Sequence, residues 1–515
     1  MSDGHLCSGP ACACHASEER QAFLDGMFSG IVDTAAPGPN LRETALRADF
    51  AHEATKCDAS RRILLRGGTI ISMDSAVGDF AQGDLLIEGT KIAAVAARIE
   101  ADATVIDASE MIVIPGFCDP HIHAWQGNLP RIIPNHASTA EDEKRGTVDP
   151  GTRTRNYRWV FHHTFGPVYR PEDTYIGTLM TMLSAINGGI TTVCDNAHNS
   201  RTAAHSDASI QALTDSGIRG IHAFGRPRFG SWDRQFPDDA YRLRSRYFSS
   251  EDQLTSLRLF MLGRDPADEL EHILKVRRDL DLWVTFDSGI GFHPLVELYE
   301  AGDLDGRETI NHGTFIAREK MEAVAAHGAT VNVCPRIETQ FRFGDVPYQA
   351  WIDVGLKPAI SNDDPATYAI DTFHEMQTLY AFQRAKAHQD ALRGDGTSPH
   401  YATLRDMLEA ATIRGAKNCA LDDRVGSLTP GKQADIVMIN TDDIHLFPRH
   451  NAVCTVVEGA NVNSVDTVFI AGRLRKWKGK LVNVDFRRLR AAAEASRDYL
   501  FREAQWPLPA IDLTD

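Results

Sequence analysis

Strand-like and helix-like segments alternate along the middle of this 515-residue chain. Short runs of β-branched and aliphatic residues recur there, and most are separated by segments with helical spacing. Strands and helices that alternate in this order are typical of βα units and a parallel sheet. Eight such units predict an α/β protein with a (β/α)8 TIM barrel. The runs are residues 111–114 leading to His121, 190–195, 218–224, 257–262, 282–287, 309–312, 330–334 and 358–363, and the clearest helical segments are 171–187, 206–216, 268–279 and 317–327.

Both flanks of the predicted barrel have a different pattern, with short strands joined by turns. The simplest arrangement is one small composite β-sandwich domain, formed by residues 59–114 and 425–482. The barrel would then occupy residues 115–424. Residues 1–58 are irregular and predict an N-terminal arm, whereas residues 483–515 predict a C-terminal helical tail.

Composition excludes several classes of partner. The formal net charge of −16 argues against nucleic acid, which would need a basic surface. No run of about 18 apolar residues is present, so no membrane partner is expected. The absence of a secretory signal and nine scattered cysteines predict a cytoplasmic protein. The cluster of Cys7, Cys12 and Cys14 could bind a metal, contact a partner subunit or belong to a mobile terminal segment.

Pro115–His123 contains two histidines, His121 and His123, at i and i+2 after a β-branched run. Side chains two residues apart on a strand point to the same side, so both imidazoles can reach one divalent metal ion. The alternative is a pair of surface or loop histidines. The strand that precedes the pair and the polar residues at other strand ends favour the metal site.

The other predicted strands also end in carboxylates, amides and imidazoles. In a barrel of this type the C-terminal ends of the strands converge on one face, where active sites lie. A role in stability alone would not need so many of these groups. They are Asp195, Asn196 and nearby His198 after the second strand, Asp287 after the fifth, His312 after the sixth, and Asp363 and Asp364 after the eighth.

Longer motifs extend this pattern. They are Pro115–His123, Gly189–Val193, Asn311–Thr314, Pro335–Gln340, Ser361–Pro365, Ala411–Thr412 and Val425–Asp435. On these motifs the sequence resembles the amidohydrolase superfamily, within the branch that contains triazine chlorohydrolases and cytosine and guanine deaminases. The resemblance covers about residues 60–480, and it implies a barrel with a composite β-sandwich.

The resemblance also implies roles for individual residues. His121 and His123 match metal ligands, and Asp363 matches the aspartate that binds the metal and takes a proton from the attacking water. His312 matches the histidine that polarises the substrate or helps to bind a metal. One divalent metal ion per subunit is implied, with zinc as the expected ion and iron(II) or manganese as alternatives. An alternative for Asp363-Asp364-Pro365 is a helix-capping loop.

The fifth strand departs from the family pattern. A metal-binding histidine is usual there, but this chain has Asp287, which could bind the metal or contact the substrate. A carboxylate ligand makes a harder site that could favour iron(II) or manganese. His293 could substitute for the missing histidine. The glutamate that usually follows is also absent, and Glu338 is either its catalytic replacement or a buried structural carboxylate paired with an arginine such as Arg336.

Substrate contacts are predicted from the loops at the same face. The long segment after the first strand carries Trp125 and Gln126, and its aromatic residues suggest a flat or apolar substrate. We also assign His198, Arg336 and Asp364 to substrate binding, and Arg226 and Arg342 lie on loops expected nearby. This long segment and the N-terminal arm also favour a homo-oligomer, a dimer or a larger assembly.

These features together predict a metal-dependent hydrolase. A metal-bound hydroxide would cleave a non-peptide C–N bond of a small cyclic or aromatic compound, by deamination or by hydrolysis of an amide or amidine. Asp363, His312 and Glu338 are the catalytic candidates. The alternatives are a decarboxylase-type lyase, a dechlorinating hydrolase and a catalytically impaired relative.

Overall fold

The structure, a computed structural model, describes residues 60–137, 149–227, 229–233, 235–250, 252–261, 267–287, 295–341, 343–394 and 402–513. The predicted N-terminal arm with Cys7, Cys12 and Cys14 lies outside the described residues, as do His293 and Arg342.

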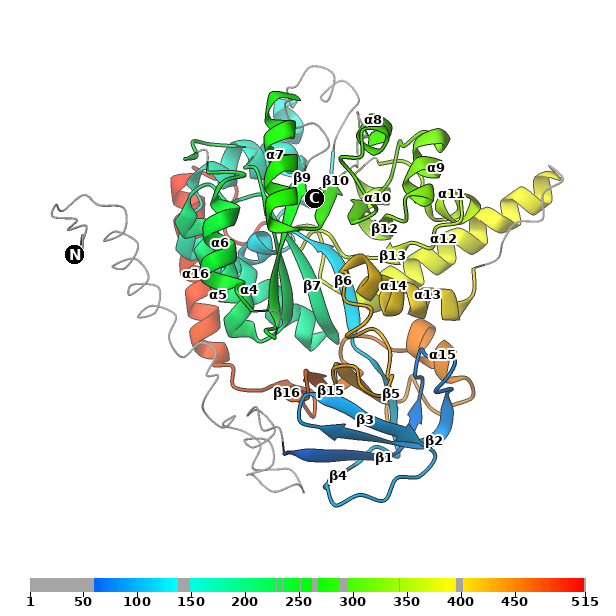
Figure 1. Cartoon of the computed structure of the whole chain (residues 1–515). Coiled ribbons are helices and arrows are strands. Elements are labelled where there is room, and N and C mark those ends of the chain that lie inside the picture. Colours follow the sequence, from blue (N-terminus) through cyan, green and yellow to red (C-terminus); the bar gives the residue numbers. More distant parts are fainter. Residues whose placement is uncertain are drawn as a thin grey trace, which may run out of the picture.

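Eight parallel strands form a barrel, which occupies the upper part of Figure 1. Each strand pairs with its neighbours in sequence order, and a parallel bridge between Ile122 and Asp363 closes the ring. The predicted α/β fold class with a (β/α)8 barrel is therefore confirmed. The strands are β6 (Phe117–Ile122), β7 (Ile190–Ala197), β8 (Arg219–Gly225), β9 (Thr255–Met261), β10 (Val284–Asp287), β11 (Glu308–Asn311), β12 (Thr330–Val333) and β13 (Ala359–Ile360).

The first barrel strand differs from the prediction. The run Met111–Pro115 is β5, which pairs with β1 and β14 outside the barrel, and the chain enters the barrel only at Phe117. Gly116 joins the two strands. A Cβ atom there would lie 2.1 Å from Thr191 Oγ1, so the chain passes too close to Thr191 for any residue with a side chain. The strand that carries His121 is thus β6.

A second, mixed sheet adjoins the N-terminal end of the barrel, because β5 leads directly into β6 (Figure 1). Its strands come from both flanks of the barrel, and the boundaries of the domains stay a prediction. The strands are β1 (Arg62–Ile70), β2 (Phe80–Glu88), β3 (Lys91–Ala96), β4 (Thr104–Asp107), β5 (Met111–Pro115), β14 (Ile436–Asn440), β15 (Val465–Ile470), β16 (Arg473–Trp477) and β17 (Lys480–Leu481).

The two faces of the mixed sheet bury different side chains. On β5, Val113 belongs to the core of the sheet itself, whereas Ile112 and Ile114 belong to the core shared with the barrel. On β14, Met438 belongs to the core of the sheet itself, and Val437 belongs to the core shared with the barrel. This period-2 alternation lets one sheet close its own core and also pack on the barrel.

Most helices pack around the barrel, and those that precede β13 in the chain lie between its strands (Figure 1). The helices are α4 (Pro171–Asn187), α5 (Ala203–Ser216), α6 (Asp239–Tyr247), α7 (Ala267–Leu280), α8 (Leu295–Glu300), α9 (Arg318–Ala326), α10 (Pro335–Gln340), α11 (Tyr348–Asp353), α12 (Thr372–Arg393), α13 (Leu404–Ala411), α14 (Ile413–Asn418), α15 (Ala452–Cys454) and α16 (Phe486–Glu503). Shorter turns are the 3-10 helices η2 (Ala124–Asn128), η3 (Pro150–Arg155) and η5 (Gly166–Val168), and the π-helices η4 (Arg158–Phe165) and η6 (Thr455–Gly459).

The long segment between β6 and α4 is held by the C-terminal tail. Leu500 of α16 and the following Trp506 share a buried cluster with Phe161 and Phe165 of η4, and the rings of Phe165 and Trp506 lie 4.8 Å apart. Trp125 of η2 belongs to the same cluster. The tail thereby fixes the segment that carries Trp125 and Gln126.

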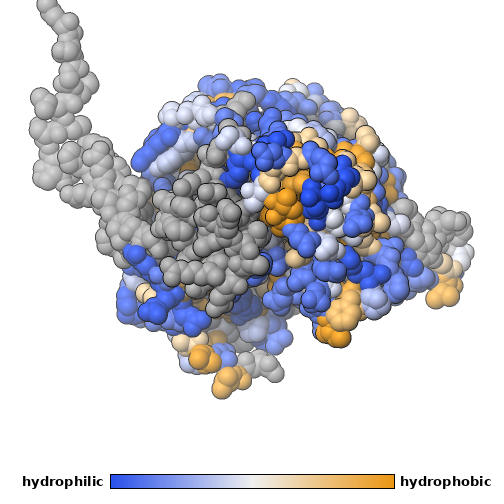
Figure 2. All heavy atoms as spheres, turned by 90° about the horizontal axis from the view of Figure 1, so that it is seen from below, coloured by the Kyte–Doolittle hydropathy of each residue, from blue (hydrophilic) through white to orange (hydrophobic). Residues whose placement is uncertain are grey.

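Exposed apolar side chains are spread over several elements. From below, the molecule has a largely hydrophilic surface interrupted by apolar patches (Figure 2). The most exposed large apolar residues include Phe315, Leu392, Ile444, Phe447 and Leu513. They do not identify one interface, so the homo-oligomer stays a prediction. Within the described ranges, no helix has both the length and the apolar character needed to cross a membrane.

Gly177 sets the contact between α4 and η2. A Cβ atom at this position would lie 2.0 Å from the backbone oxygen of Trp125. We expect Gly177→Ala to destabilise the fold by about 3 kcal/mol, because backbone must move to admit the methyl group. Thermal unfolding can measure this loss against Ser184→Ala, an exposed position on the same helix. Equal melting temperatures for the two variants would contradict the close packing.

Candidate metal centre

Four strand ends bring the predicted polar residues together. His121 lies on β6 and His123 follows it, Asp287 ends β10, His312 follows β11, and Asp363 lies beyond β13. His312 and Asp363 have φ values of 64° and 66°, in the left-handed region that non-glycine residues seldom occupy. Such strained backbone is concentrated at functional sites.

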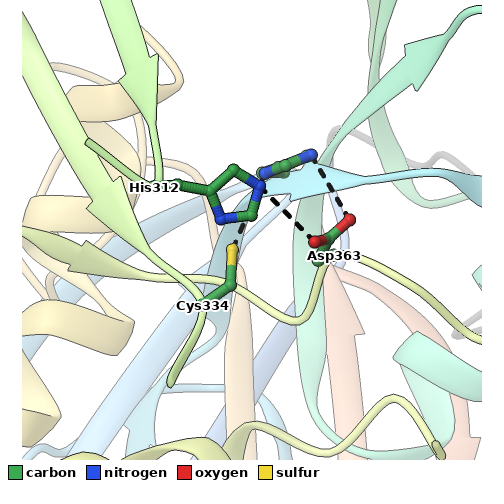
Figure 3. Close-up of side chains that lie close together, drawn as sticks. His312, Cys334 and Asp363 are labelled. Atoms are coloured by element: carbon green, nitrogen blue, oxygen red, sulfur yellow. Dashed lines mark hydrogen bonds and ion pairs between the residues drawn. The ribbon is translucent and has the colours of Figure 1, made fainter. Parts of the chain in front are cut away.

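The side chains converge through one ring nitrogen of each histidine. The Nε2 atoms of His121 and His123 are 3.2 Å apart, and they lie 3.5 and 3.4 Å from Asp363 Oδ1. Nε2 of His312 lies 3.5 Å from Asp363 Oδ2. Figure 3 shows His312 and Asp363 facing each other within this group. The two oxygens of Asp363 thus face different histidines.

These spacings fit a metal ion. Ligands at 2.0–2.1 Å from a tetrahedral zinc ion are about 3.3–3.4 Å apart, close to the distances among His121, His123 and Asp363. Two imidazole nitrogens at 3.2 Å also need a cation or a proton between their lone pairs. The donor set of imidazole and carboxylate groups suits zinc, and the added carboxylate of Asp287 also suits harder ions.

The other ring nitrogen of each histidine has an outer partner. His123 Nδ1 lies 3.0 Å from the Asn196 carbonyl oxygen, and His312 Nδ1 lies 3.3 Å from Glu338 Oε1. His121 Nδ1 lies 3.6 Å from Cys334 Sγ. Outer partners of this kind fix the tautomer and the orientation of metal-binding histidines.

Burial and mutual charge shift the protonation of the group. Burial lowers the pKa of His121 well below its usual value, and the neighbouring histidines lower it further. Burial raises the pKa of Asp363 well above its usual value, although the charge of His312 opposes this. Burial also disfavours the His312 cation, but Glu338, Asp363 and Asp287 outweigh it and raise the pKa of His312 to about 9.

Several predicted site residues lie beside this group. Asp287 Oδ1 is 3.5 Å from His312 Nε2. The ring of His198 is 4.4 Å from that of His123 and 5.4 Å from that of Trp125. Gln126 donates a hydrogen bond to the Tyr157 hydroxyl at 2.6 Å. The structure therefore brings Asp287, His198 and Trp125 to the same face as the histidine pair.

Arg336, predicted to contact the substrate or to pair with Glu338, has another carboxylate as its partner. Arg336 does not pair with Glu338 as one prediction had it; it lies 3.7 Å from Glu375 and over the ring of Tyr368. The sequence does not reveal this pair, because Arg336 lies on α10 and Glu375 lies on α12.

Asp364 and Arg226 also have structural partners. Asp364 accepts hydrogen bonds from Ala366 N and Thr367 Oγ1 in a turn, whereas the next helix, α12, is capped by Asp371, so the helix-capping role expected as an alternative is not seen. Arg226 pairs with Glu269. Neither contact tests a role in substrate binding, so the substrate contacts of Asp364 and Arg226 stay predictions.

Sequence reasoning missed two residues at the site, Cys334 and Asp119. Cys334 directly follows a buried strand, β12, and has the pattern of an ordinary core residue. Asn196 is one of the predicted strand-end residues, but it contacts His123 through its backbone oxygen, which side-chain patterns do not reveal. Asp119 lies within the strand-one motif and accepts hydrogen bonds from His121 N and from Asn362, while burial raises its pKa to about 7. Its place two residues before His121 was the available signal.

A parallel barrel with histidines and aspartates converging at its C-terminal strand ends defines a barrel enzyme with a candidate metal centre. Residues 112–475 match the amidohydrolase family, and the chain belongs to that family. It is accordingly a hydrolase that acts on carbon–nitrogen bonds. The predicted resemblance to the amidohydrolase superfamily is confirmed.

Individual relatives agree with this assignment. The chain is 25% identical to a 5-methylthioadenosine/S-adenosylhomocysteine deaminase of Pyrococcus horikoshii, over 82% of this chain and 96% of the relative. A deaminase of the same name from Thermococcus kodakarensis is 26% identical, over 80% and 93%.

Solved structures share the fold. A zinc-bound adenosine deaminase from Xanthomonas campestris has a TM-score of 0.72 at 21% identity, covering 86% of this chain and 99% of its own. An atrazine chlorohydrolase from Arthrobacter aurescens, complexed with zinc, has a TM-score of 0.70 at 22% identity, covering 84% and 99%.

Proposed function

We propose that this protein is a metal-dependent hydrolase that cleaves a non-peptide C–N bond of a small cyclic or aromatic compound. Deamination is the leading reaction, with amide or amidine hydrolysis next. The main support for this proposal is the geometry of the site. The Nε2 atoms of three histidines converge on Asp363, and the Nδ1 atom of each ring has a partner on its outer side. The names of the relatives, which are deaminases, support the same reaction.

His121, His123 and Asp363 would hold one divalent metal ion per subunit, with Asp287 as a further candidate ligand. When bound, such an ion lowers the pKa of water from 15.7 to about 7 and so supplies hydroxide near neutral pH. Zinc is the proposed ion, with iron(II) and manganese as alternatives because Asp287 stands beside His312.

Asp363 is suited to two tasks. Its Oδ1 faces His121 and His123, whereas Oδ2 faces His312 Nε2. Oδ2 would accept the proton of the attacking water.

His312 would stabilise negative charge on the substrate. Its Nδ1 is held by Glu338 and its Nε2 faces Asp363 and Asp287. As a cation it can donate a hydrogen bond from Nε2 to the substrate atom that gains charge. Glu338 lies behind the ring, so it would act in catalysis through His312.

Aromatic groups and two buried polar atoms suit a flat substrate with hydrogen-bonding edges. The ring of Phe343 lies 5.2 Å from that of His312, and Trp125 packs beside His198. Trp125 Nε1 and Gln126 Oε1 are buried, and neither has a hydrogen-bond partner among the described residues. A donor and an acceptor of this kind are costly unless a ligand or water pairs with them.

The test combines metal quantification with a substrate screen. Purified protein should contain about one equivalent of metal per subunit and release ammonia from some aminated heterocycle, amide or urea. Chloride and carbon dioxide should be measured in the same reactions, because either product without ammonia would instead support the dechlorinating or decarboxylating alternative. No stoichiometric metal, and no activity after addition of zinc, iron(II) or manganese, would identify an impaired relative.

A further inference from the structure

Cys334 stands directly behind one of the proposed metal ligands. It follows β12, is fully buried, and its Sγ lies 3.6 Å from His121 Nδ1. Its sulfur points toward the side of His312 and Asp363 in Figure 3. His121 presents its opposite nitrogen, Nε2, to His123 and Asp363. The thiol therefore contacts the outer edge of the ring, although its sulfur is also close to the other ligand atoms.

The surroundings of Cys334 fix the direction of this contact. Asn332 Nδ2 donates to Asn311 Oδ1 at 2.8 Å, which turns Asn332 Oδ1 toward Ser361 and Cys334. The Cys334 S–H can donate to that oxygen, at a sulfur–oxygen distance of 4.0 Å. A sulfur lone pair then remains for the Nδ1–H of His121.

We infer that Cys334 is a positioning residue that accepts a hydrogen bond from His121 Nδ1–H and so holds the tautomer in which Nε2 can bind a metal ion. This inference rests on the proposed function. In metal sites generally, the loss of such an outer partner weakens metal binding by 10–100-fold. A thiol is a weak acceptor, and it takes the place of the carboxylate or carbonyl oxygen that usually holds such a ring.

The backbone N–H of Cys334 supports a different histidine, His312. Its N–H donates to Glu338 Oε1 at 2.8 Å, and the same oxygen lies 3.3 Å from His312 Nδ1. The turn from Cys334 to Glu338 thus supports His121 through a side chain and His312 through a backbone group. A side-chain substitution at Cys334 leaves the backbone donor in place, so its effect reports on His121.

Cys334→Ala and Cys334→Ser test the inference, with Cys419→Ala as the matched control. Cys419 is also a buried thiol of the barrel, but it packs with Cys194, Ile221 and Ala223. Zinc affinity is measured by competition with a chromogenic chelator, and thermal unfolding of the metal-free proteins is measured in parallel. We expect Cys334→Ala to bind zinc 10–100-fold more weakly than the wild type, and Cys419→Ala to bind it equally well. Cys334→Ser should lie between them, because its shorter side chain keeps an acceptor but at a greater distance.

A second readout is the 15N spectrum of the histidine rings in the zinc-loaded protein. The wild type should show one ring proton on Nδ1 of His121, and the Cys334→Ala variant should show that proton exchanging faster with water. Wild-type zinc affinity and an unchanged spectrum in Cys334→Ala would overturn the role of Cys334 alone. Failure of the wild-type protein to bind any metal would overturn the proposed function and this inference together.

Discussion

Asp363→Asn is expected to lower kcat by roughly 10²–10⁴-fold, the range that a positioned acid–base group contributes. The amide keeps an oxygen and the size of the side chain, but it cannot accept a proton at the position of Oδ2. It also carries no charge to balance a cation beside His121 and His123. Steady-state kinetics of ammonia release, with the metal content of each sample, measure the effect.

The matched control is Asp353→Asn. Asp353 is an exposed carboxylate on α11 that accepts a hydrogen bond from Gln349. Its variant should keep wild-type kcat. An Asp363→Asn enzyme that binds metal and retains more than about a tenth of wild-type kcat would show that another group accepts the proton.

Removal of His123 is expected to abolish metal retention. Its Nε2 lies 3.2 Å from His121 Nε2 and 3.4 Å from Asp363 Oδ1, while its Nδ1 is held by Asn196. We expect His123→Ala to weaken metal binding by at least about 100-fold, because even an outer partner accounts for 10–100-fold. Turnover should fall in parallel. Elemental analysis after dialysis and kinetics with added zinc measure both quantities.

His163→Ala controls for the loss of an imidazole outside the proposed centre. His163 is exposed on η4. This variant should hold as much metal as the wild type. Full metal occupancy in His123→Ala would remove the histidine pair from the proposed centre.

Periodicity in the sequence predicted the barrel because its strands and helices are local patterns. It also predicted which strand ends carry His121, His312 and Asp363, since parallel strands end at one face. The sequence pattern places residues 111–114 both in the run that leads to His121 and in the β-sandwich of residues 59–114, and only the strand pairing shows that β5 lies outside the barrel and β6 within it.

Side-chain contacts between residues far apart in the sequence were not predicted. The pairing of Arg336 with Glu375 depends on how α10 and α12 pack. The role of Cys334 depends on a contact with His121, far away in the chain. A residue type alone does not reveal such a contact, and a buried cysteine at a strand end is ordinarily a packing residue.

The closure of the barrel has a consequence for how metal binding and folding are linked. Asp363 N donates to the His121 carbonyl oxygen at 2.9 Å, and His123 N donates to the Asp363 carbonyl oxygen at 2.7 Å. The ring is therefore sealed by the backbones of the same three residues whose side chains would hold the ion. An ion bound here would link the first and last strands, and it would stabilise the closed ring by an amount that grows with the logarithm of the metal concentration relative to Kd. Metal supply would then set not only how fast the enzyme works but also what fraction of its molecules is folded.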